Sequence, residues 1–165
     1  SHVRDTLTLG ARRIGHGVNL ITDPDLMLIM RDGPALIEIN LISNLLLDYV
    51  DDYSQHPFPE YLRTGIPVAL STDDRGMWDS TMTDEFFVAT TEFNLSWDEI
   101  KQLNVNSLKY SFVDEDTKQK LLTHYDKRVI SFEETMTREG MKSLLAVDPD
   151  IRSFICKEYQ LCTLK

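Results

Sequence analysis

The sequence has little of what several classes of protein depend on. Only two cysteines, Cys156 and Cys162, occur in 165 residues. They are too few and too close together for a disulfide framework, and no CxxC pair offers a structural zinc site. We therefore expect reduced thiols, which favours a cytoplasmic location.

Positive charge is also scarce. There are 17 Lys and Arg against 27 Asp and Glu, so the formal net charge is -10. Nucleic-acid binding needs clustered basic side chains that displace counterions from the phosphates, and no basic stripe appears in this sequence. The composition argues against nucleic acid as a partner.

Long apolar runs are absent as well. No run approaches the roughly 20 residues that a membrane helix needs, and residues 1–10 lack the apolar core of a signal peptide. We expect a soluble chain without a membrane partner. The hydrophobic share of 42% is enough to build a core, and the length suits one globular domain.

Short β-like runs alternate with helical patterns in the first half of the chain. This alternation predicts an α/β fold with a parallel sheet. Each predicted strand leads into a polar residue, and ligands of α/β folds bind at the carboxyl edge of the sheet. The predicted strands are residues 13–15, 35–39 and 68–72, which lead into His16, Asn40 and Asp73, with helices over 23–30 and 57–63 between them.

The second half is wholly helical in pattern. Ser96 and Glu99 form a capping box, in which each side chain satisfies a free amide of the other residue's backbone. Residues 140–165 predict a short terminal helix or a loosely docked tail, so we divide the chain into units 1–139 and 140–165. The predicted helices of this half are 83–93, 96–103 with a continuation toward 110, and 114–136.

Two motifs carry chemistry. Asp73 and Asp74 follow a buried-strand pattern, where adjacent carboxylates raise each other's pKa unless a cation, a donor or a substrate compensates. A metal ion is the simplest compensation. His16 lies between Gly15 and Gly17 at the end of another strand, which presents the imidazole with little steric cover. Alone, the Asp pair also fits a helix cap, and His16 a turn.

These motifs, in their order, resemble the second half of the adenosine deaminase superfamily. The strings are RIGHG at 13–17, IEINLISN at 37–44 and GIPVALSTDD at 65–74, and the similarity runs from about residue 3 to residue 134. Further details, such as His56-Pro57, look most like the adenosine deaminase-related growth factor branch. AMP deaminases share much of the pattern. The growth factor branch is commonly secreted, so the resemblance adds secretion as an alternative location.

The resemblance implies the C-terminal half of a TIM-type (β/α)8 barrel of the metal-dependent hydrolase type, with strands 6–8 and the helices that follow. A complete barrel typically takes about 250 residues, so this chain is too short to close one. The family's His-x-His pair and His-Ala-Gly-Glu motif do not occur here. We therefore expect an N-terminal half of the same protein, or a second copy, to complete the site, and this chain alone to be inactive.

The resemblance also implies roles for three residues. Asp73 resembles the zinc ligand, and Asp74 resembles the aspartate that binds the substrate through N7 of the purine. His16 resembles the catalytic histidine, which is not a metal ligand and hydrogen-bonds the water that zinc activates. The implied reaction is hydrolytic deamination of a purine nucleoside, adenosine, to inosine and ammonia.

Two departures leave the substrate open. Asn40-Leu41 replaces the usual Cys-Pro, and Arg75 replaces the Pro that usually follows Asp-Asp. The Arg75 guanidinium suits a surface salt bridge, with Asp74 or a substrate anion as other partners. The alternatives are a deaminase of AMP or another aminated purine, and an inactive or structural half-barrel that binds a partner chain.

Four other features have local interpretations. Ser43 and Asn44 most simply cap a helix over 45–49, with a role at the pocket rim as the alternative. His56 is expected to start the helix before Pro57. Glu38, inside an apolar strand, is expected to pair with Arg13 across the sheet. The doublet at 51–52 lies in a polar loop and is expected to be solvated, with a calcium site as the alternative.

Overall fold

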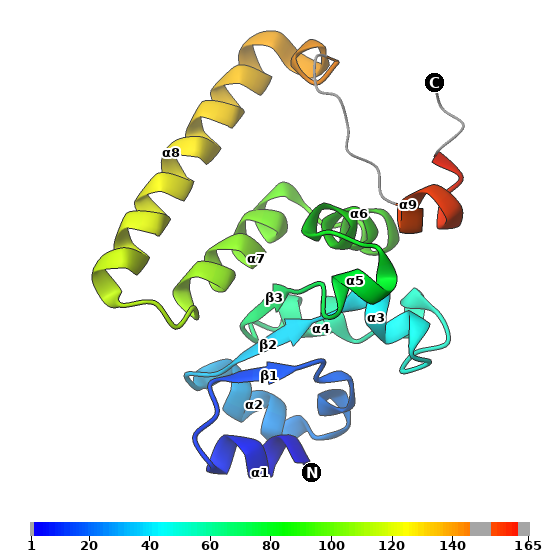
Figure 1. Cartoon of the computed structure of the whole chain (residues 1–165). Helices are drawn as coiled ribbons and strands as arrows, with labels where there is room; N and C mark the ends of the chain where they lie inside the picture. Colours follow the sequence, from blue (N-terminus) through cyan, green and yellow to red (C-terminus); the bar gives the residue numbers. More distant parts are fainter. Residues whose placement is uncertain (1, 146–152, 162–165) are drawn as a thin grey trace.

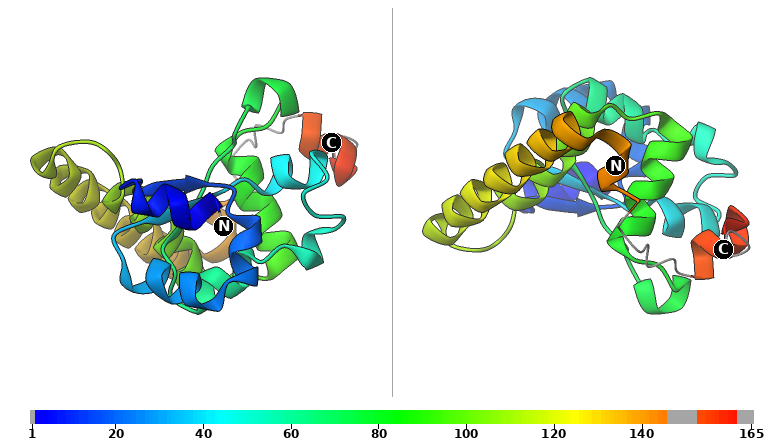
Figure 2. Two further views of the ribbon diagram at one scale, coloured as in Figure 1. Left: turned by 90° about the horizontal axis from the view of Figure 1, so that it is seen from below. Right: turned by 90° about the horizontal axis from the view of Figure 1, so that it is seen from above.

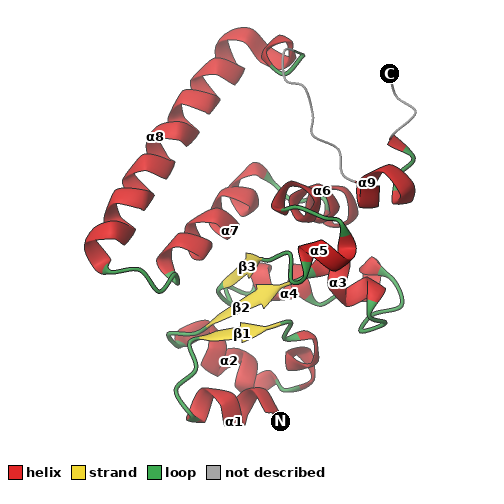
Figure 3. Ribbon diagram, viewed as in Figure 1, coloured by secondary structure: helices red, strands yellow, loops and turns green. Residues whose placement is uncertain are grey.

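The computed structural model describes residues 2–145 and 153–161. A parallel three-stranded sheet lies at its centre, in the order β1-β2-β3 (Figures 1 and 3). The strands are β1 (Arg13–Gly15), β2 (Leu36–Ile39) and β3 (Val68–Leu70). The prediction of a parallel α/β sheet is confirmed, and β2 and β3 are shorter than predicted.

Strand β2 forms the middle of the core. Leu36, Ile37 and Ile39 are completely buried, so apolar side chains point to both faces of the strand. Both faces are covered, as expected for a parallel sheet. Ile37 pairs with Ile14 of β1 and with Val68 of β3, which aligns the carboxyl ends of all three strands at one edge. The residues that follow the strands are thereby brought to one region.

Helices surround the sheet. The chain begins with α1 (His2–Thr8), and α2 (Pro24–Asp32) and α4 (Phe58–Arg63) belong to the crossovers between the parallel strands. Helix α7 (Trp97–Lys109) packs against β3, and α8 (Glu115–Glu139) lies against α7 on the side away from the sheet (Figure 1). The other described elements are η1 (Val18–Thr22), α3 (Leu41–Leu46), η2 (Tyr53–Gln55), α5 (Arg75–Trp78), α6 (Met82–Phe93), η3 (Gly140–Ser143) and α9 (Ser153–Glu158).

Helix α3 begins four residues earlier than predicted. It starts at Leu41, directly after β2, with Asn40 at the N-cap position. Ser43 and Asn44 are therefore inside the helix and completely buried, so the prediction that they cap a helix over 45–49 is wrong. The apolar residues at 41, 42 and 45 face the core or pack against it, which extends the helix back to the strand.

Side-chain caps define most of the other helix starts. The predicted capping box of Ser96 and Glu99 is present at α7, and Thr81 with Asp84 forms a second one at α6. In the predicted solvated loop, Asp52 accepts the amide of Ser54 and caps η2. These local bonds satisfy backbone donors that the helix itself leaves free.

Helix α8 extends beyond the rest of the molecule (Figure 2). It is 25 residues long and has no buried residue. Its hydrogen bonds to α7 include two to one carboxylate: Trp97 and Lys101 donate to Glu133, at 2.6 and 3.0 Å. These polar groups are partly open to water, where such pairs stabilise little.

Helix α9 docks on the core through Phe154 and Ile155, which are 8% and 3% exposed. Among the described residues, 153–158 thus form a short helix, one of the two alternatives predicted for 140–165. Cys156 on this helix is disulfide-bonded, so the prediction of a reduced thiol is wrong there. Cys162 lies outside the described residues. The boundary between 139 and 140 stays a prediction.

The two outer strands, β1 and β3, leave both edges of the sheet without a neighbouring strand among the described residues. One group at the β3 edge is satisfied by a side chain: Asn106 of α7 donates to the carbonyl of Val68 at 2.9 Å. At β1, Arg13 binds Glu38 across the sheet, as predicted. None of the described helices combines the length and apolar character needed to cross a membrane.

Candidate active site

His16 lies one residue beyond β1. Its backbone amide donates to the carbonyl of Glu38 at 2.9 Å, which continues the sheet by one bond. Its φ angle is then +63°, and that of Gly17 is also +63°. A Cβ at Gly17 would lie 2.7 Å from a methyl group of Ile37, so only glycine fits there. The left-handed turn directs the imidazole out of the sheet edge.

Tyr61 of α4 stabilises this turn through its hydroxyl group. Its hydroxyl accepts a hydrogen bond from the amide of Ile21 at 2.8 Å and lies 3.0 Å from the carbonyls of Gly17 and Val18. The ring is completely buried. Because its hydroxyl joins the start of η1 to its end, Tyr61 holds the segment that carries the imidazole.

Asp73 lies at the end of the extended run that follows β3. Its φ angle is +53°, and Ser43 of α3 donates to its Oδ2 at 2.6 Å. The same oxygen is 4.0 Å from Nε2 of His16, and both side chains are about one-third exposed, 33% and 34%. The structure therefore brings together two of the three residues predicted from the sequence, from strands that flank β2.

Asp74 has a different place. Its side chain accepts the amide of Met77 at 3.1 Å and caps α5, and the residue is exposed. This is the helix-cap alternative stated for the Asp pair. No hydrogen bond or ion pair joins Asp74 to His16 within the described part of the chain. Arg75 is exposed and makes no ion pair with any described residue, so the expected salt bridge is not found.

A chain of polar side chains leads away from His16 into the core. Nδ1 of His16 lies 2.8 Å from the amide oxygen of Asn44 and 3.0 Å from the amide nitrogen of Asn40. The amide nitrogen of Asn44 lies 2.8 Å from Nε2 of His56, and Nδ1 of His56 accepts the amide of Phe58 at 3.1 Å. His56 thus binds the first turn of α4, although the helix starts later than predicted, at Phe58 with Pro57 at the N-cap.

His56 is deeply buried, at 2% exposed. Burial lowers its pKa to about 4, because the core disfavours the charged imidazolium. His56 is therefore neutral at physiological pH. No pattern in the sequence connects His56 with His16, since the two residues are 40 positions apart and Asn44 joins them only in three dimensions.

Glu85 supports helix α3, which carries Ser43 and Asn44. This carboxyl group of α6 is completely buried and accepts the amides of Leu41 and Ile42, at 2.9 and 3.4 Å. Burial raises the pKa of Glu85 to about 8, and the two amides oppose that rise. The first turn of α3 is thereby anchored to α6. The one signal in the sequence is an acidic residue directly before the apolar run 86–89.

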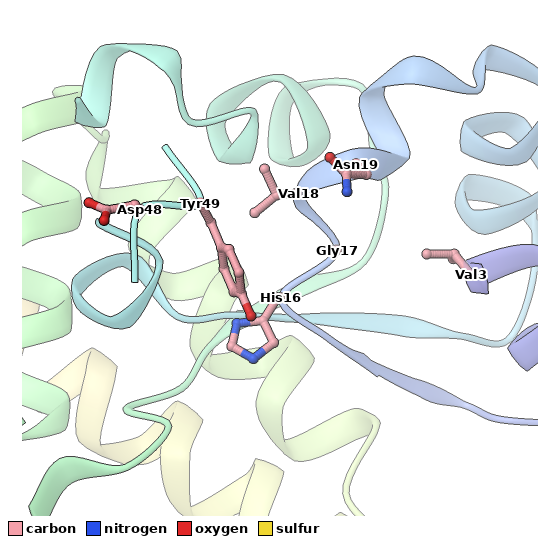
Figure 4. A pocket seen from close by; sticks show the side chains of 7 residues that line it. All are labelled: Val3, His16, Gly17, Val18, Asn19, Asp48 and Tyr49. Atoms are coloured by element: carbon pink, nitrogen blue, oxygen red, sulfur yellow. The ribbon is translucent and has the colours of Figure 1, made fainter. Parts of the chain in front are cut away.

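A pocket of about 440 Å³ opens beside His16 (Figure 4). Tyr49 forms one wall, with its ring edge-on to the imidazole at 5.5 Å between centroids. Asp73 and Asp74 do not line this pocket. It is bounded by Val3, His16, Gly17, Val18, Asn19, Asp48 and Tyr49.

The described residues contain no group of three His, Cys, Asp or Glu side chains that would hold a metal ion. They do offer one ligand of suitable chemistry. Oδ2 of Asp73 accepts from Ser43, and no hydrogen bond reaches Oδ1 from the part of the chain described here. A partly exposed, oriented carboxylate fits one position of a zinc site, and the remaining ligands must come from elsewhere.

Sequence comparison gives a consistent set of relatives. A family model for adenosine deaminase matches residues 1–128. The chain is 36% identical over 126 residues to the adenosine deaminase of Enterococcus faecalis, covering 76% of this chain and 37% of that protein. It is 37% identical over 115 residues to that of Pseudoalteromonas translucida, covering 70% and 34%. The chain thus spans about a third of the length of these relatives.

Solved structures agree with the sequence matches. An adenine deaminase from Arthrobacter aurescens superposes with a TM-score of 0.73 at 27% identity, covering 78% of this chain and 39% of that one. The N6-methyl-AMP deaminase of Arabidopsis thaliana gives 0.67 at 25%, covering 76% and 37%. A Zn-bound amidohydrolase from Burkholderia ambifaria gives 0.75 at 18%, covering 83% and 39%, which shows the fold alone. The three strands and the helices around them form part of such a (β/α)8 barrel, consistent with its C-terminal half.

Proposed function

Because this chain belongs to the adenosine deaminase family, we propose that it is the C-terminal part of a zinc-dependent enzyme that hydrolyses adenosine to inosine and ammonia. In this reaction water adds to C6 of the purine, and the amino group leaves as ammonia. The adenosine deaminases that are 36% and 37% identical to the chain support this reaction class. An N-terminal half with the family's other zinc ligands and its proton-shuttling glutamate is required for activity.

The proximity of His16 and Asp73 is the observation that carries the proposal. Nε2 of His16 is 4.0 Å from Oδ2 of Asp73, although the residues are 57 positions apart and end different strands. This distance is too long for a direct hydrogen bond and short enough for both groups to contact the same oxygen atom.

Asp73 is the proposed zinc ligand. Zinc, when bound, lowers the pKa of a water molecule toward neutrality and so supplies a nucleophile. Ser43 holds the Asp73 carboxylate in a fixed orientation through its 2.6 Å hydrogen bond. Such outer contacts commonly affect metal affinity or activity by about tenfold to a hundredfold.

His16 and Asp74 are the proposed contacts to the reacting molecules. His16 orients the attacking water through Nε2, the nitrogen that faces Asp73. Asp74 shares a hydrogen bond with N7 of the purine, which favours addition at C6 because the ring gains protons during that step. In the chain as described, Asp74 caps α5. Binding the substrate therefore requires its carboxylate to serve both contacts or to leave the cap.

Reassembly tests the proposal. The chain is mixed or co-expressed with the N-terminal half of the Enterococcus faecalis relative, and zinc content and adenosine hydrolysis are measured. We expect Asp73→Ala to abolish zinc retention, and His16→Ala to retain zinc and lower turnover by about a hundredfold or more. Asp51→Ala, in an exposed loop, is the matched control. Equal zinc loss in the Asp73 and His16 variants would refute this division of roles.

A related substrate is the second candidate. The superposed N6-methyl-AMP deaminase and adenine deaminase act on other aminated purines, as their names state. Arg75, exposed beside Asp74, is suited to an anionic group on the substrate. If AMP is the substrate, Arg75→Ala will raise KM for AMP and leave hydrolysis of adenosine unchanged. No activity toward any of these purines after reassembly would favour the non-enzymatic alternative.

A further inference from the structure

The polar contacts that join His16 to His56 do not match the donors and acceptors of two neutral imidazoles. A neutral imidazole has one nitrogen that donates and one that accepts. Both nitrogens of His56 face donors: the Phe58 amide at Nδ1 and the Asn44 amide nitrogen at Nε2. At His16 the conflict recurs on one atom, because Nδ1 faces the nitrogen of Asn40 and the oxygen of Asn44.

A backbone amide can only donate a hydrogen bond, so the contact with Phe58 determines the tautomer of His56. Nδ1 of His56 must accept from Phe58, so the neutral ring carries its proton on Nε2. The atom of Asn44 that faces Nε2 must then be the oxygen. The two ends of a carboxamide have the same shape, and their identity follows from the hydrogen-bond network. Exchanging the two ends of Asn44 removes the conflict at His56.

The same exchange removes the conflict at His16. The amide nitrogen of Asn44 now faces Nδ1 of His16, as the nitrogen of Asn40 already does. Both asparagines therefore require Nδ1 to accept. Exchanging the ends of Asn40 instead would make His16 consistent with a proton on Nδ1, but it would leave two donors facing His56.

We propose that His56 and Asn44 are positioning residues that set the tautomer of His16, with the proton on Nε2 and directed toward Asp73. This inference rests on the proposed function for its consequence. A neutral His16 of this tautomer donates a hydrogen bond to the oxygen between it and Asp73, and it has no free lone pair there to remove a proton. His16 then orients and stabilises the nucleophile, and a different group accepts the proton of the attacking water.

Nitrogen chemical shifts test the tautomer directly. The chain has four histidines, so a protein with isotope-labelled histidine gives few ring signals to assign. In the neutral rings of His16 and His56 we expect the proton on Nε2 alone. A proton on Nδ1 of His16 in the wild-type protein would overturn the proposal. This measurement needs neither substitution, zinc nor substrate.

Asn44→Asp is the informative variant. A carboxylate only accepts hydrogen bonds, so the variant keeps the bond from His56 and requires a donor at Nδ1 of His16. We expect the Nδ1 signal of His16 to change to that of a protonated nitrogen, while His56 keeps its tautomer. An unchanged His16 signal in a folded Asn44→Asp protein would contradict the proposal. Asn94→Asp, at an exposed position, is the control.

Kinetics of the reassembled enzyme separate the two proposals. We expect Asn44→Asp to lower kcat by about tenfold to a hundredfold with little change in KM, and Asn94→Asp to have no effect. Wild-type shifts as expected in a protein without deaminase activity would refute the proposed function and support the tautomer assignment. An active enzyme whose His16 carries its proton on Nδ1 would refute the tautomer assignment alone.

Discussion

Two regions of the molecule differ in the contacts that stabilise them: the region at the carboxyl ends of the strands, and helix α8. Around the strand ends, buried polar groups such as Asn44, His56 and Glu85 each contact specific partners. Helix α8 has no buried residue, and exposed or half-exposed polar groups join it to α7. Loss of a partner in the first region leaves a buried group unsatisfied, whereas water replaces it in the second. Matched substitutions in the two regions should therefore differ sharply in effect.

The largest difference is expected for glutamate-to-alanine substitutions. Glu85→Ala removes the acceptor for the amides of Leu41 and Ile42 and leaves a cavity, so the free energy of unfolding should fall by about 2 to 3 kcal/mol. Glu134→Ala, on the exposed surface of α8, should leave it unchanged. Urea denaturation of both variants measures the difference. Equal midpoints would show that Glu85 does not anchor α3.

The pH dependence of the free energy of unfolding tests the contribution of Glu85 separately. Its pKa is raised to about 8 in the folded protein from 4.5 in the unfolded chain, so the folded state binds the proton more tightly. The stability that Glu85 contributes is therefore complete below about pH 4.5 and is lost as the pH rises toward about 8. Glu85→Gln should remove this part of the pH dependence. Parallel stability curves for wild type and variant over this range would contradict the assignment.

Tyrosine-to-phenylalanine substitutions give a smaller contrast. Tyr61→Phe leaves the partly buried amide of Ile21 and the carbonyl of Gly17 without their hydroxyl partner, at a cost of about 1 to 2 kcal/mol. Tyr125→Phe on α8 loses one long hydrogen bond, 3.4 Å to the carbonyl of Lys101, and should have little effect. Thermal unfolding of the two variants is the measurement. A larger loss in the Tyr125 variant would reverse the comparison.

The smallest effect is expected at the contact between α7 and α8. Glu133→Gln removes the charge that pairs with Lys101 and keeps an oxygen that accepts from Trp97. Because these groups are partly open to solvent, the unfolding midpoint should stay within the scatter of repeated measurements. A large loss of stability would show that α8 contributes to the core after all.

Sequence patterns predicted the sheet and its polar edge because these depend on local signals. The strand β1 was predicted with its observed bounds, and the Ser96–Glu99 capping box was identified from residues three positions apart. His16 and Asp73 follow strands, and parallel strands align their carboxyl ends. Their proximity could therefore be inferred from the order of elements alone.

The support behind the site could not be predicted in the same way. Ser43 and Asn44 have the composition of a helix cap, and the tertiary contact of Leu41 with the core extends the helix past them. His56 and Glu85 reach α3 from 12 and about 44 positions along the chain. No pattern of period 2 or 3.6 encodes such contacts, because they depend on how separate elements pack.

The backbone conformation at His16 and Asp73 has a consequence for how the sequence evolves. Both residues have left-handed φ angles, +63° and +53°, in which a side chain costs about 1 kcal/mol or more relative to glycine. Folding alone would favour glycine at each of these positions. Descendants of this protein that no longer need the imidazole and the carboxylate should therefore drift toward glycine at 16 and 73, and those two codons would record whether selection for chemistry has continued.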